Sequence, residues 1–334
     1  WYDHPIQIGV EAEKNEIVYG LRGLDEAIAF EKERGVIEKD VKVQCVLSVS
    51  VTHEGLHELA KPYLEAVLKR TRGIHHLRVC IMTDSDVSRL INDIFSPAAA
   101  YYMGRMKRDI LHEILGVDGE YGRHYTFLKS ISAFWQVFIN PVVRGTFKID
   151  LDQVFPENEL VRETGSSALE HLKTPLWGAE GMDGDGNALK LGMIAGALVN
   201  EKDISHSLFT PDVTFSTDEI NGDEWIFCSP LPQAISTEAE MLCRYTEGDL
   251  DGRDRCIQRV HVTGGTCGIL VEDLRRFRPF TPGFIGRAED QAYLLSVLSD
   301  NSEETLRYVH KDGLVMRHDK HAFAGEAIRS ARIG

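Results

Sequence analysis

Two apolar, β-branched segments constrain the fold of this chain more than any other feature of its sequence. Val41–Val51 (VKVQCVLSVSV) and Leu77–Met82 (LRVCIM) flank a helical pattern that runs from about Glu54 to Arg70. Runs rich in Val and Ile are typical of strands that are buried on both faces of a parallel sheet. A strand, a helix and a strand at this spacing form a βαβ unit, whose crossover is expected to be right-handed. The sequence therefore predicts an α/β fold.

Further helices and shorter strands are expected on both sides of this unit. Apolar spacing predicts a helix before residue 40 that stops at Gly35, and residues 88–140 have a mostly helical pattern. The remaining expected elements are a strand at Phe147–Leu151, a short helix-like piece at 189–200, a strand at 257–263, a tight turn at 264–268, a short helix at 272–277, an amphipathic helix at 287–298 and a strand-like start to the segment from Leu306.

Bulk properties narrow the class of protein. The 334 residues suffice for one large α/β domain or two ordinary ones. A net charge of −15 argues against nucleic acid as the main partner, because phosphate backbones are held by clustered Lys and Arg. No apolar run is long enough for a transmembrane segment. The six cysteines form no C-x-x-C pair, which argues against a zinc ribbon. Cys45 and Cys80 lie inside apolar runs, where a free Cys behaves as a small apolar residue, so we expect reduced thiols and a cytoplasmic location. The first residue is Trp1, and the chain could belong to a larger multidomain protein or a homo-oligomer.

Acidic side chains follow the predicted strands at their carboxyl ends. Asp84 and Asp86 come directly after the second apolar run, and Asp150 and Asp152 come after Gly145–Ile149. Ligands of open α/β sheets bind at this edge. We therefore expect the substrate site there.

Asp150-Leu151-Asp152 is the strongest candidate for a metal site. Alternation along the strand places both carboxylates on one face, while Leu151 points back toward the core. Two hard oxygen donors suit Mg²⁺ or Mn²⁺, which keep open positions for substrate phosphates. A turn or a helix N-cap is the structural alternative for these two acids.

Other motifs favour ordinary structural roles. The acids of Asp183–Asn187 lack the Gly and Glu of an EF-hand loop, so a surface turn is the better interpretation. Gly264–Gly268 has the spacing GGxxG rather than GxGxxG, which argues against dinucleotide binding. Glu289 and Asp290 lie in the first turn of a predicted helix, where acids commonly stabilise the helix dipole. His310, His318 and His321 lack the H-E-x-x-H pattern of zinc proteases.

In their order along the chain, these pieces resemble the GT-A glycosyltransferases, over about residues 41–323. The βαβ unit is similar to the nucleotide-binding half of that family, and Asp150-Leu151-Asp152 is similar to its DXD motif. Gly286-Arg287-Ala288-Glu289-Asp290 is similar to its G-x-x-ED segment. His318 best fits the third metal ligand of several such families, with His310 and His321 as rivals. Two departures are Ser50–Glu54, which lacks the usual Pro and aromatic residue, and residues 200–255, which match no part of the pattern.

The resemblance implies a GT-A-type fold with a mixed, mainly parallel sheet flanked by helices. Residues 1–40 would form a helical lead-in and 41–334 the transferase domain, with a nucleotide-binding half at about 41–155 and an acceptor half at 156–334. The implied activity moves a sugar from a nucleoside-diphosphate sugar to an acceptor hydroxyl. Mn²⁺ or Mg²⁺ would be held by Asp150, Asp152 and His318, and Asp84 would contact the donor nucleoside. Glu289 and Asp290 would be the catalytic acids on the acceptor side.

Two other functions remain open at the level of sequence. A nucleotidyltransferase could use the same sheet and acids, although Val51–Gly55 is not the Gly-rich, basic loop that it needs. A sugar- or metal-binding domain without catalysis is the second alternative.

Overall fold

A computed structural model of the chain describes residues 15–51, 53–104, 108–117, 123–173, 180–182, 188–200, 266–276 and 305–318. These residues fall into two compact units, and each is treated by itself below. The first unit holds the described residues up to Ile131, and the second holds those from Ser132 onward.

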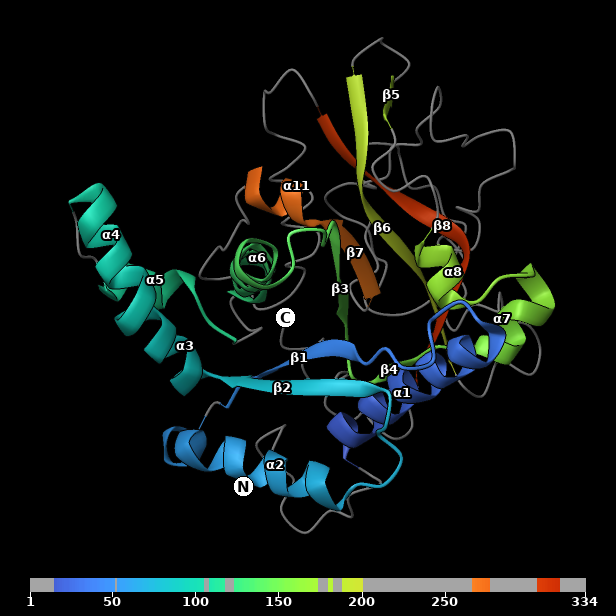
Figure 1. Cartoon of the computed structure of the whole chain (residues 1–334), viewed down its shortest axis with the longest axis horizontal. Helices are drawn as coiled ribbons and strands as arrows, with labels where there is room; N and C mark the ends of the chain where they lie inside the picture. Colours follow the sequence, from blue (N-terminus) through green and yellow to red (C-terminus); the bar gives the residue numbers. More distant parts are fainter. Residues whose placement is uncertain are drawn as a thin grey trace, which may run out of the picture. The chain divides into compact units, whose positions relative to one another are not determined.

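The predicted βαβ unit forms the centre of the first unit. β1 (Val43–Val49) pairs in parallel with β2 (Leu77–Thr83), in a register that runs from Val43 opposite Leu77 to Val49 opposite Thr83. The 3-10 turn η2 (Glu54–Leu56) and α2 (His57–Arg70) connect the two strands, and α2 lies along the strand pair (Figure 1). Both predicted strands and the predicted helix are thus confirmed.

The two strands are less buried than their apolar sequences predict. Leu47, Val49 and Ile81 are buried, but Gln44 and Cys80 are exposed. In the described part of the chain, β1 and β2 form a sheet of only two strands. Each strand therefore has one edge that no other described strand covers, and side chains along these edges remain accessible to water. The two apolar runs therefore predicted the positions of the strands correctly, but they predicted more buried side chains than the structure shows.

The three described cysteines are free thiols, as expected, but they differ in environment. Cys267 is buried, Cys45 is partly buried, and Cys80 is exposed. Burial, with a smaller contribution from the neighbouring Cys80, raises the pKa of the Cys45 thiol to about 11. Cys45 therefore stays protonated at neutral pH and packs as a small apolar side chain.

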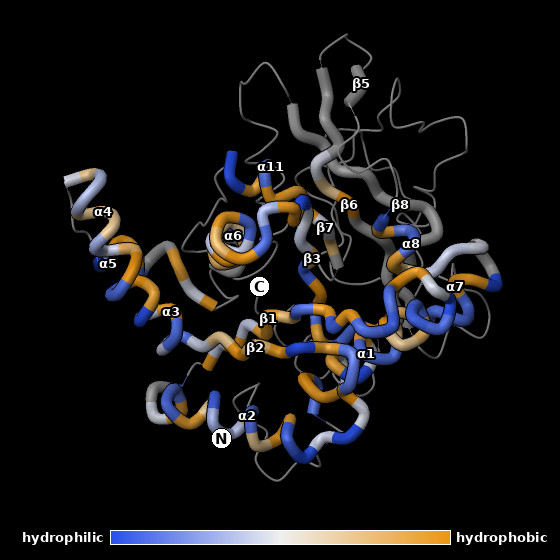
Figure 2. Tube along the Cα trace, viewed as in Figure 1, coloured by the Kyte–Doolittle hydropathy of each residue, from blue (hydrophilic) through white to orange (hydrophobic). Residues whose placement is uncertain are grey.

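α1 (Glu16–Arg34) is the predicted N-terminal helix, with both ends capped. The side chain of Asn15 accepts a hydrogen bond from the Ile17 N–H at 2.9 Å, which satisfies one of the free amides of the first turn. Gly35 ends the helix with φ 76°, a left-handed conformation that Gly adopts without steric cost. Hydrophilic and hydrophobic residues alternate along α1 and α2, as is typical of helices with one buried face (Figure 2).

A buried carboxylate ties α1 to the start of β2. Asp25 is 2% exposed, and its Oδ1 atom accepts the backbone N–H groups of His75, His76 and Leu77 at 3.0, 2.7 and 3.0 Å. Charge-assisted hydrogen bonds of this kind are stronger than those between neutral groups. Asp25 thus fixes the entry of the chain into the strand that leads to Asp84.

The region after β2 is helical, as predicted for residues 88–140. Its buried cluster joins α3 and the following π-helix to later residues of the first unit through Val87, Ile91, Leu115, Val117 and Phe127. The elements are α3 (Asp84–Leu90), the π-helix η3 (Ile91–Phe95), α4 (Ser96–Met103), α5 (Arg108–Ile114), α6 (Arg123–Phe134) and the π-helix η5 (Trp135–Ile139).

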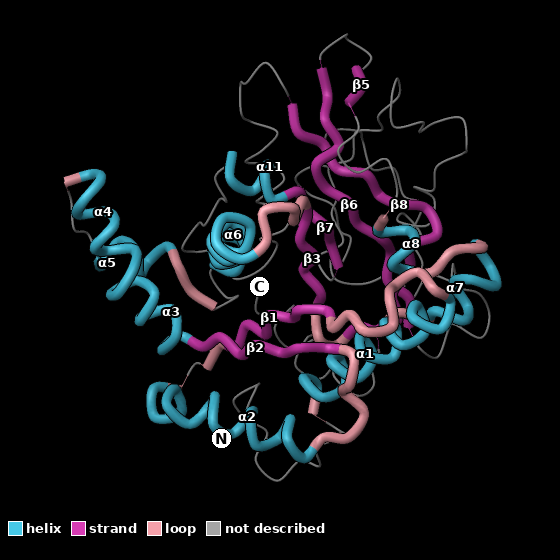
Figure 3. The backbone as a smooth tube through the Cα atoms, in the orientation of Figure 1, coloured by secondary structure: helices cyan, strands magenta, loops and turns pink. Residues whose placement is uncertain are grey.

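The second unit is built on a mixed sheet whose described strands follow the order β3-β7-β6-β8-β4, with β5 paired to β6. β6 and β8 are the long strands and lie side by side in parallel (Figure 3). The strands are β3 (Gly145–Ile149), β4 (Gln153–Val154), β5 (Glu180–Met182), β6 (Ala188–Asn200), β7 (Thr266–Leu270) and β8 (Thr305–His318), and the helices are α7 (Glu157–Thr164), α8 (Ala168–Leu172) and α11 (Val271–Arg276).

The prediction of a helix-like piece at 189–200 is wrong, because these residues belong to strand β6. Its two glycines, Gly192 and Gly196, lie at the points where the pairing with β8 shifts register. Glycine is common at such irregularities of strands. These glycines disturbed the period-two pattern by which a strand is recognised in sequence.

The prediction of a tight turn at 264–268 is also wrong for the described residues of this range, because Thr266–Leu270 forms strand β7. The strand expected at Phe147–Leu151 is β3, the short helix at 272–277 is α11, and the strand-like start after Leu306 is β8. The strand expected at 257–263 and the helix at 287–298 lie outside the described residues.

The described strands confirm an α/β protein with a mixed sheet, but most of their pairs are not parallel. β1–β2 and β6–β8 are parallel, whereas β3–β7, β4–β8, β5–β6 and β6–β7 are antiparallel. The resemblance to GT-A glycosyltransferases implied a mainly parallel sheet, and this expectation does not fit the described strands of the second unit, most of whose pairs are antiparallel.

Candidate functional site

The candidate metal-binding acids occupy a turn between two strands of the second unit. β3 ends at Ile149, Asp150 follows it directly, and the turn closes with a hydrogen bond from the Gln153 N–H to the Asp150 carbonyl at 3.3 Å. Gln153 then begins β4. The two acids therefore lie on a three-residue turn between two strands and not on a strand, so the alternation that was expected to place both carboxylates on one face does not apply to them.

The two carboxylates differ in environment. Asp150 has a side chain that is 45% exposed, and its Oδ1 atom lies 3.1 Å from the Nζ atom of Lys148. Asp152 is partly buried, and its Oδ1 atom is inaccessible to solvent. Lys148 and Asp150 are two residues apart, so they project from the same side of the strand end. The sequence analysis had not singled out Lys148, although a cation two residues before an acid in a strand signals such a pair.

His318 meets this turn through the sheet. It is the last residue of β8, and its backbone lies opposite Gln153 in the antiparallel pairing of β4 with β8. Residues that face each other in such a ladder have Cα atoms about 4.5–5.5 Å apart. The register thus brings His318 beside the residue that follows Asp152. His310, its rival in the same strand, lies opposite Ala195 of β6 instead, and His321 lies outside the described residues.

The residues of the turn fit a divalent cation by their chemistry. Two carboxylates supply the hard oxygen ligands that Mg²⁺ and Mn²⁺ prefer, and an imidazole shifts the preference toward a transition metal. Among the side chains that the structure describes, no group of three His, Cys, Asp or Glu residues could hold a metal ion. The imidazole of His318 is not among those side chains, so this finding concerns the carboxylates and not the full set of three.

Asp84 lies in a separate open pocket of the first unit. It is the first residue of α3, directly after β2, so it occupies the carboxyl end of a parallel strand as expected. The pocket has a volume of about 300 Å³ and is lined by the first residues of α2 and one side of α3, namely His57, Glu58, Asp84, Ser85, Ser88 and Arg89. Ligands of parallel sheets bind at this edge.

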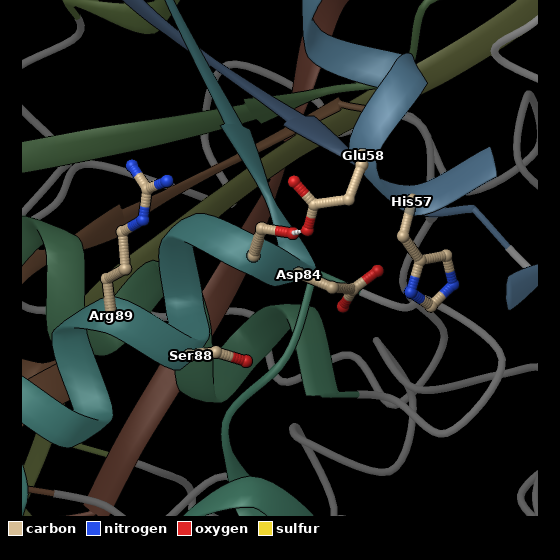
Figure 4. A pocket seen from close by; sticks show the side chains of 6 residues that line it. His57, Glu58, Asp84, Ser88 and Arg89 are labelled. Carbon is tan, nitrogen blue, oxygen red and sulfur yellow. Dashed lines mark hydrogen bonds between the residues drawn. The ribbon is translucent and has the colours of Figure 1, made fainter. Parts of the chain in front are cut away.

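Polar side chains dominate this pocket. His57, Glu58 and Asp84 lie near the start of α3, and Arg89 lies farther along the same helix (Figure 4). The Ser85 hydroxyl donates a hydrogen bond to Glu58 Oε1 at 3.0 Å, which joins α2 to α3. Except for Asp84, sequence analysis missed these residues, although His57 and Glu58 open the helix after a predicted strand.

Asp86, the second acid after β2, has a structural role. Its carboxylate accepts hydrogen bonds from Lys61 Nζ at 2.9 Å and from the backbone N–H and hydroxyl of Thr83 at 3.0 Å. Burial alone would raise the pKa of Asp86, but these hydrogen bonds and the Lys61 charge outweigh it and hold the pKa below its usual value. Asp86 thus caps α3, the helix whose first residue is Asp84.

The predicted acceptor-side acids, Glu289 and Asp290, lie outside the described residues. Their assignment stays a prediction. In the described part of the chain, no helix combines the length and the apolar character needed to cross a membrane.

Comparisons with protein-family models, with curated proteins and with solved structures found no match for this chain.

Proposed function

We propose that this protein is a metal-dependent glycosyltransferase that takes its sugar from a nucleoside-diphosphate donor. The observation that carries the proposal is the pairing of Gln153 with His318, because it brings a histidine beside a turn that already holds Asp150 and Asp152. In this proposal two carboxylates of the turn and an imidazole from a distant part of the chain form the ligand set of the metal, which a capping or turn role would not require. The resemblance to GT-A glycosyltransferases relates this ligand set to diphosphate binding.

In this proposal the residues of the turn hold the donor diphosphate. A divalent cation, when bound, neutralises charge on the departing diphosphate. Asp150, Asp152 and His318 fix the position of that cation on the sheet. Lys148, whose ammonium lies 3.1 Å from Asp150, adds a positive charge that favours the approach of phosphate oxygens.

Asp84 and Asp290 serve other parts of the reaction. Asp84 accepts hydrogen bonds from the donor nucleoside, since it lines a polar pocket at the end of β2. Asp290, together with Glu289, contacts the acceptor hydroxyl. An acid within about 2.6–3.2 Å of that hydroxyl acts as the base in an inverting reaction, or as a positioning group in a retaining one.

The test is release of nucleoside diphosphate from a panel of nucleotide sugars, with and without Mn²⁺. Wild-type protein should release the diphosphate of at least one donor only when Mn²⁺ is present, and the double variant Asp150→Asn/Asp152→Asn should release none. The matched control is Asp93→Asn, because Asp93 is exposed on a helix of the first unit. Release of pyrophosphate from nucleoside triphosphates would instead indicate a nucleotidyltransferase, and metal-dependent binding without turnover of any donor or acceptor would indicate a binding domain.

A further inference from the structure

The pocket beside Asp84 contains a second carboxylate, that of Glu58. Glu58 lies in the first turn of α2 and Asp84 is the first residue of α3, so two helices supply the two acids. The hydroxyl of Ser85, the residue after Asp84, donates a hydrogen bond to Glu58 Oε1 at 3.0 Å. This bond holds the Glu58 carboxylate at the start of α3, where both acids line the same pocket (Figure 4).

Both carboxylates can accept hydrogen bonds from a bound molecule. Glu58 is exposed and Asp84 is partly buried, so a ligand reaches them from solvent. A carboxylate offers about four acceptor sites on its two oxygens, so Glu58 can accept from a ligand while it accepts from Ser85. Ser88 follows Asp84 by one helical turn, on the same side of α3, and adds a neutral hydroxyl to the lining. The pocket thus offers several acceptors to a ligand that brings donors.

The charges of the lining favour a neutral group that is rich in O–H donors. Phosphate oxygens would be repelled by the two carboxylates. An ammonium group would be attracted by the acids but repelled by Arg89, which lines the same pocket. The described His, Cys, Asp and Glu side chains, those of this pocket included, form no group of three that could hold a metal ion. Two neighbouring hydroxyls of a sugar carry no charge, and each donates one hydrogen bond.

We propose that this pocket binds the ribose diol of the donor, with Asp84 accepting from one hydroxyl and Glu58 from the other. The donor is then a ribonucleoside-diphosphate sugar and not a 2′-deoxyribonucleoside-diphosphate sugar. The assignment rests on the proposed function, in which the donor nucleoside lies beside Asp84. A volume of about 300 Å³ is at the lower end for ligand pockets and suits a nucleoside better than a whole nucleotide sugar. The diphosphate stays outside the pocket, away from both carboxylates.

The diol should be recognised with a measurable preference. A site that hydrogen-bonds a hydroxyl rejects an analogue without it, because the acceptor loses water and gains no partner. Each hydroxyl here donates to a charged acceptor, which makes the bond stronger than one between neutral groups. We therefore expect removal of either the 2′- or the 3′-hydroxyl to weaken binding by about ten-fold or more.

The experiment is calorimetric titration of the full chain, in the presence of Mn²⁺, with a ribonucleoside diphosphate and its 2′-deoxy and 3′-deoxy analogues. The wild type should bind the ribonucleotide about ten-fold or more tightly than either analogue. Glu58→Ala should bring one of these two preferences close to one, and Asp84→Ala should do so for the other. Ser85→Ala removes the hydroxyl that holds Glu58 and should lower the same preference as Glu58→Ala, which keeps the test open if that variant does not fold.

Glu65→Ala is the matched control, because Glu65 is an exposed acid on the same helix as Glu58. It should keep both preferences of the wild type. A merely structural role of Glu58, as an acid that stabilises the first turn of α2, predicts a lowered melting temperature and unchanged preferences. Unchanged preferences in Glu58→Ala would therefore overturn its role in the pocket.

The outcomes separate this inference from the proposed function. Mn²⁺-dependent binding of a nucleoside diphosphate, with equal affinity for its deoxy analogues, would overturn the inference and leave the proposed function intact. Absence of binding of every nucleoside diphosphate would overturn both. Binding of 1,4-diaminobutane that is lost in Glu58→Ala, without any preference among the nucleotides, would assign the pocket to an amine instead.

Discussion

His318 lies opposite Gln153 in the antiparallel pairing of β4 with β8, beside the turn that carries Asp150 and Asp152. The two strands come from distant parts of the chain, so this neighbourhood depends on the sheet and not on any local motif. In the same strand, His310 lies opposite Ala195. The register therefore places the backbone of His318, and not that of His310, next to the acidic turn.

His318→Ala is predicted to weaken Mn²⁺ binding by roughly ten-fold or more, because loss of an outer-shell partner alone typically costs 10–100-fold in metal affinity. His310→Ala is the matched control from the same strand and should bind Mn²⁺ as the wild type does. The measurement is titration of each protein with Mn²⁺, followed by the relaxation of water protons. Equal affinities of the two variants would remove His318 from the ligand set.

The pocket at the end of β2 gives a prediction for Asp84. A hydrogen bond to a charged group contributes about 1.5–3 kcal/mol, so Asp84→Asn should weaken binding of a nucleoside diphosphate by about ten-fold or more. Asp93→Asn should leave the affinity unchanged. Calorimetric titration measures both. A complex in which Asp84 lies more than about 3.5 Å from base and ribose would exclude this role.

Asp25 should dominate the stability of the first unit. Asp25→Ala leaves the backbone N–H groups of His75, His76 and Leu77 without their acceptor, and each such group costs about 1–3 kcal/mol where it stays dry. We expect a loss of about 3 kcal/mol or more in the free energy of unfolding, measured by urea denaturation. Asp40→Asn, at an exposed acid, should stay within about 0.5 kcal/mol of the wild type. A similarly small effect of Asp25→Ala would show that water replaces the carboxylate.

Asp86 gives the stability a predictable dependence on pH. Its pKa is lowered in the folded state, so its contribution is present above the ordinary carboxyl pKa of about 3.9 and is lost as pH falls through the lower folded value. Asp86→Asn should therefore be less stable than the wild type by about 1 kcal/mol at pH 7, with a difference that shrinks below pH 4. Denaturation curves from pH 7 to pH 3 test this. A difference that grows on acidification would contradict the lowered pKa.

Local sequence pattern predicted the first unit well, because its elements follow one another along the chain. β1, α2 and β2 are each recognisable from their own residues, and α1 ends at Gly35 as expected. The role of Asp25 was not predicted. This residue lies between Leu21 and Ile28 at the helical spacing of buried positions, where a charged side chain indicates a specific hydrogen-bond partner.

Prediction was less successful in the second unit, where pairing partners lie far apart in sequence. The glycines of β6 concealed a strand, and the pattern of a βαβ unit gave no indication that β3 pairs with β7 in the antiparallel direction. The Asp150–Asp152 turn was recognisable because it directly follows an apolar strand. The proximity of His318 could be expected only from a resemblance, since sheet register is decided by tertiary pairing.

The account depends most directly on whether Asp150 and Asp152 bind a metal-nucleotide complex. Calorimetric titration with a panel of nucleoside diphosphates, in the presence and absence of Mn²⁺, tests this for the wild type, for Asp150→Asn/Asp152→Asn and for the control Asp93→Asn. We predict that at least one diphosphate binds the wild type and the control only with Mn²⁺ and does not bind the double variant. Equal binding by the double variant, or no Mn²⁺-dependent binding of any diphosphate by the wild type, would contradict the account.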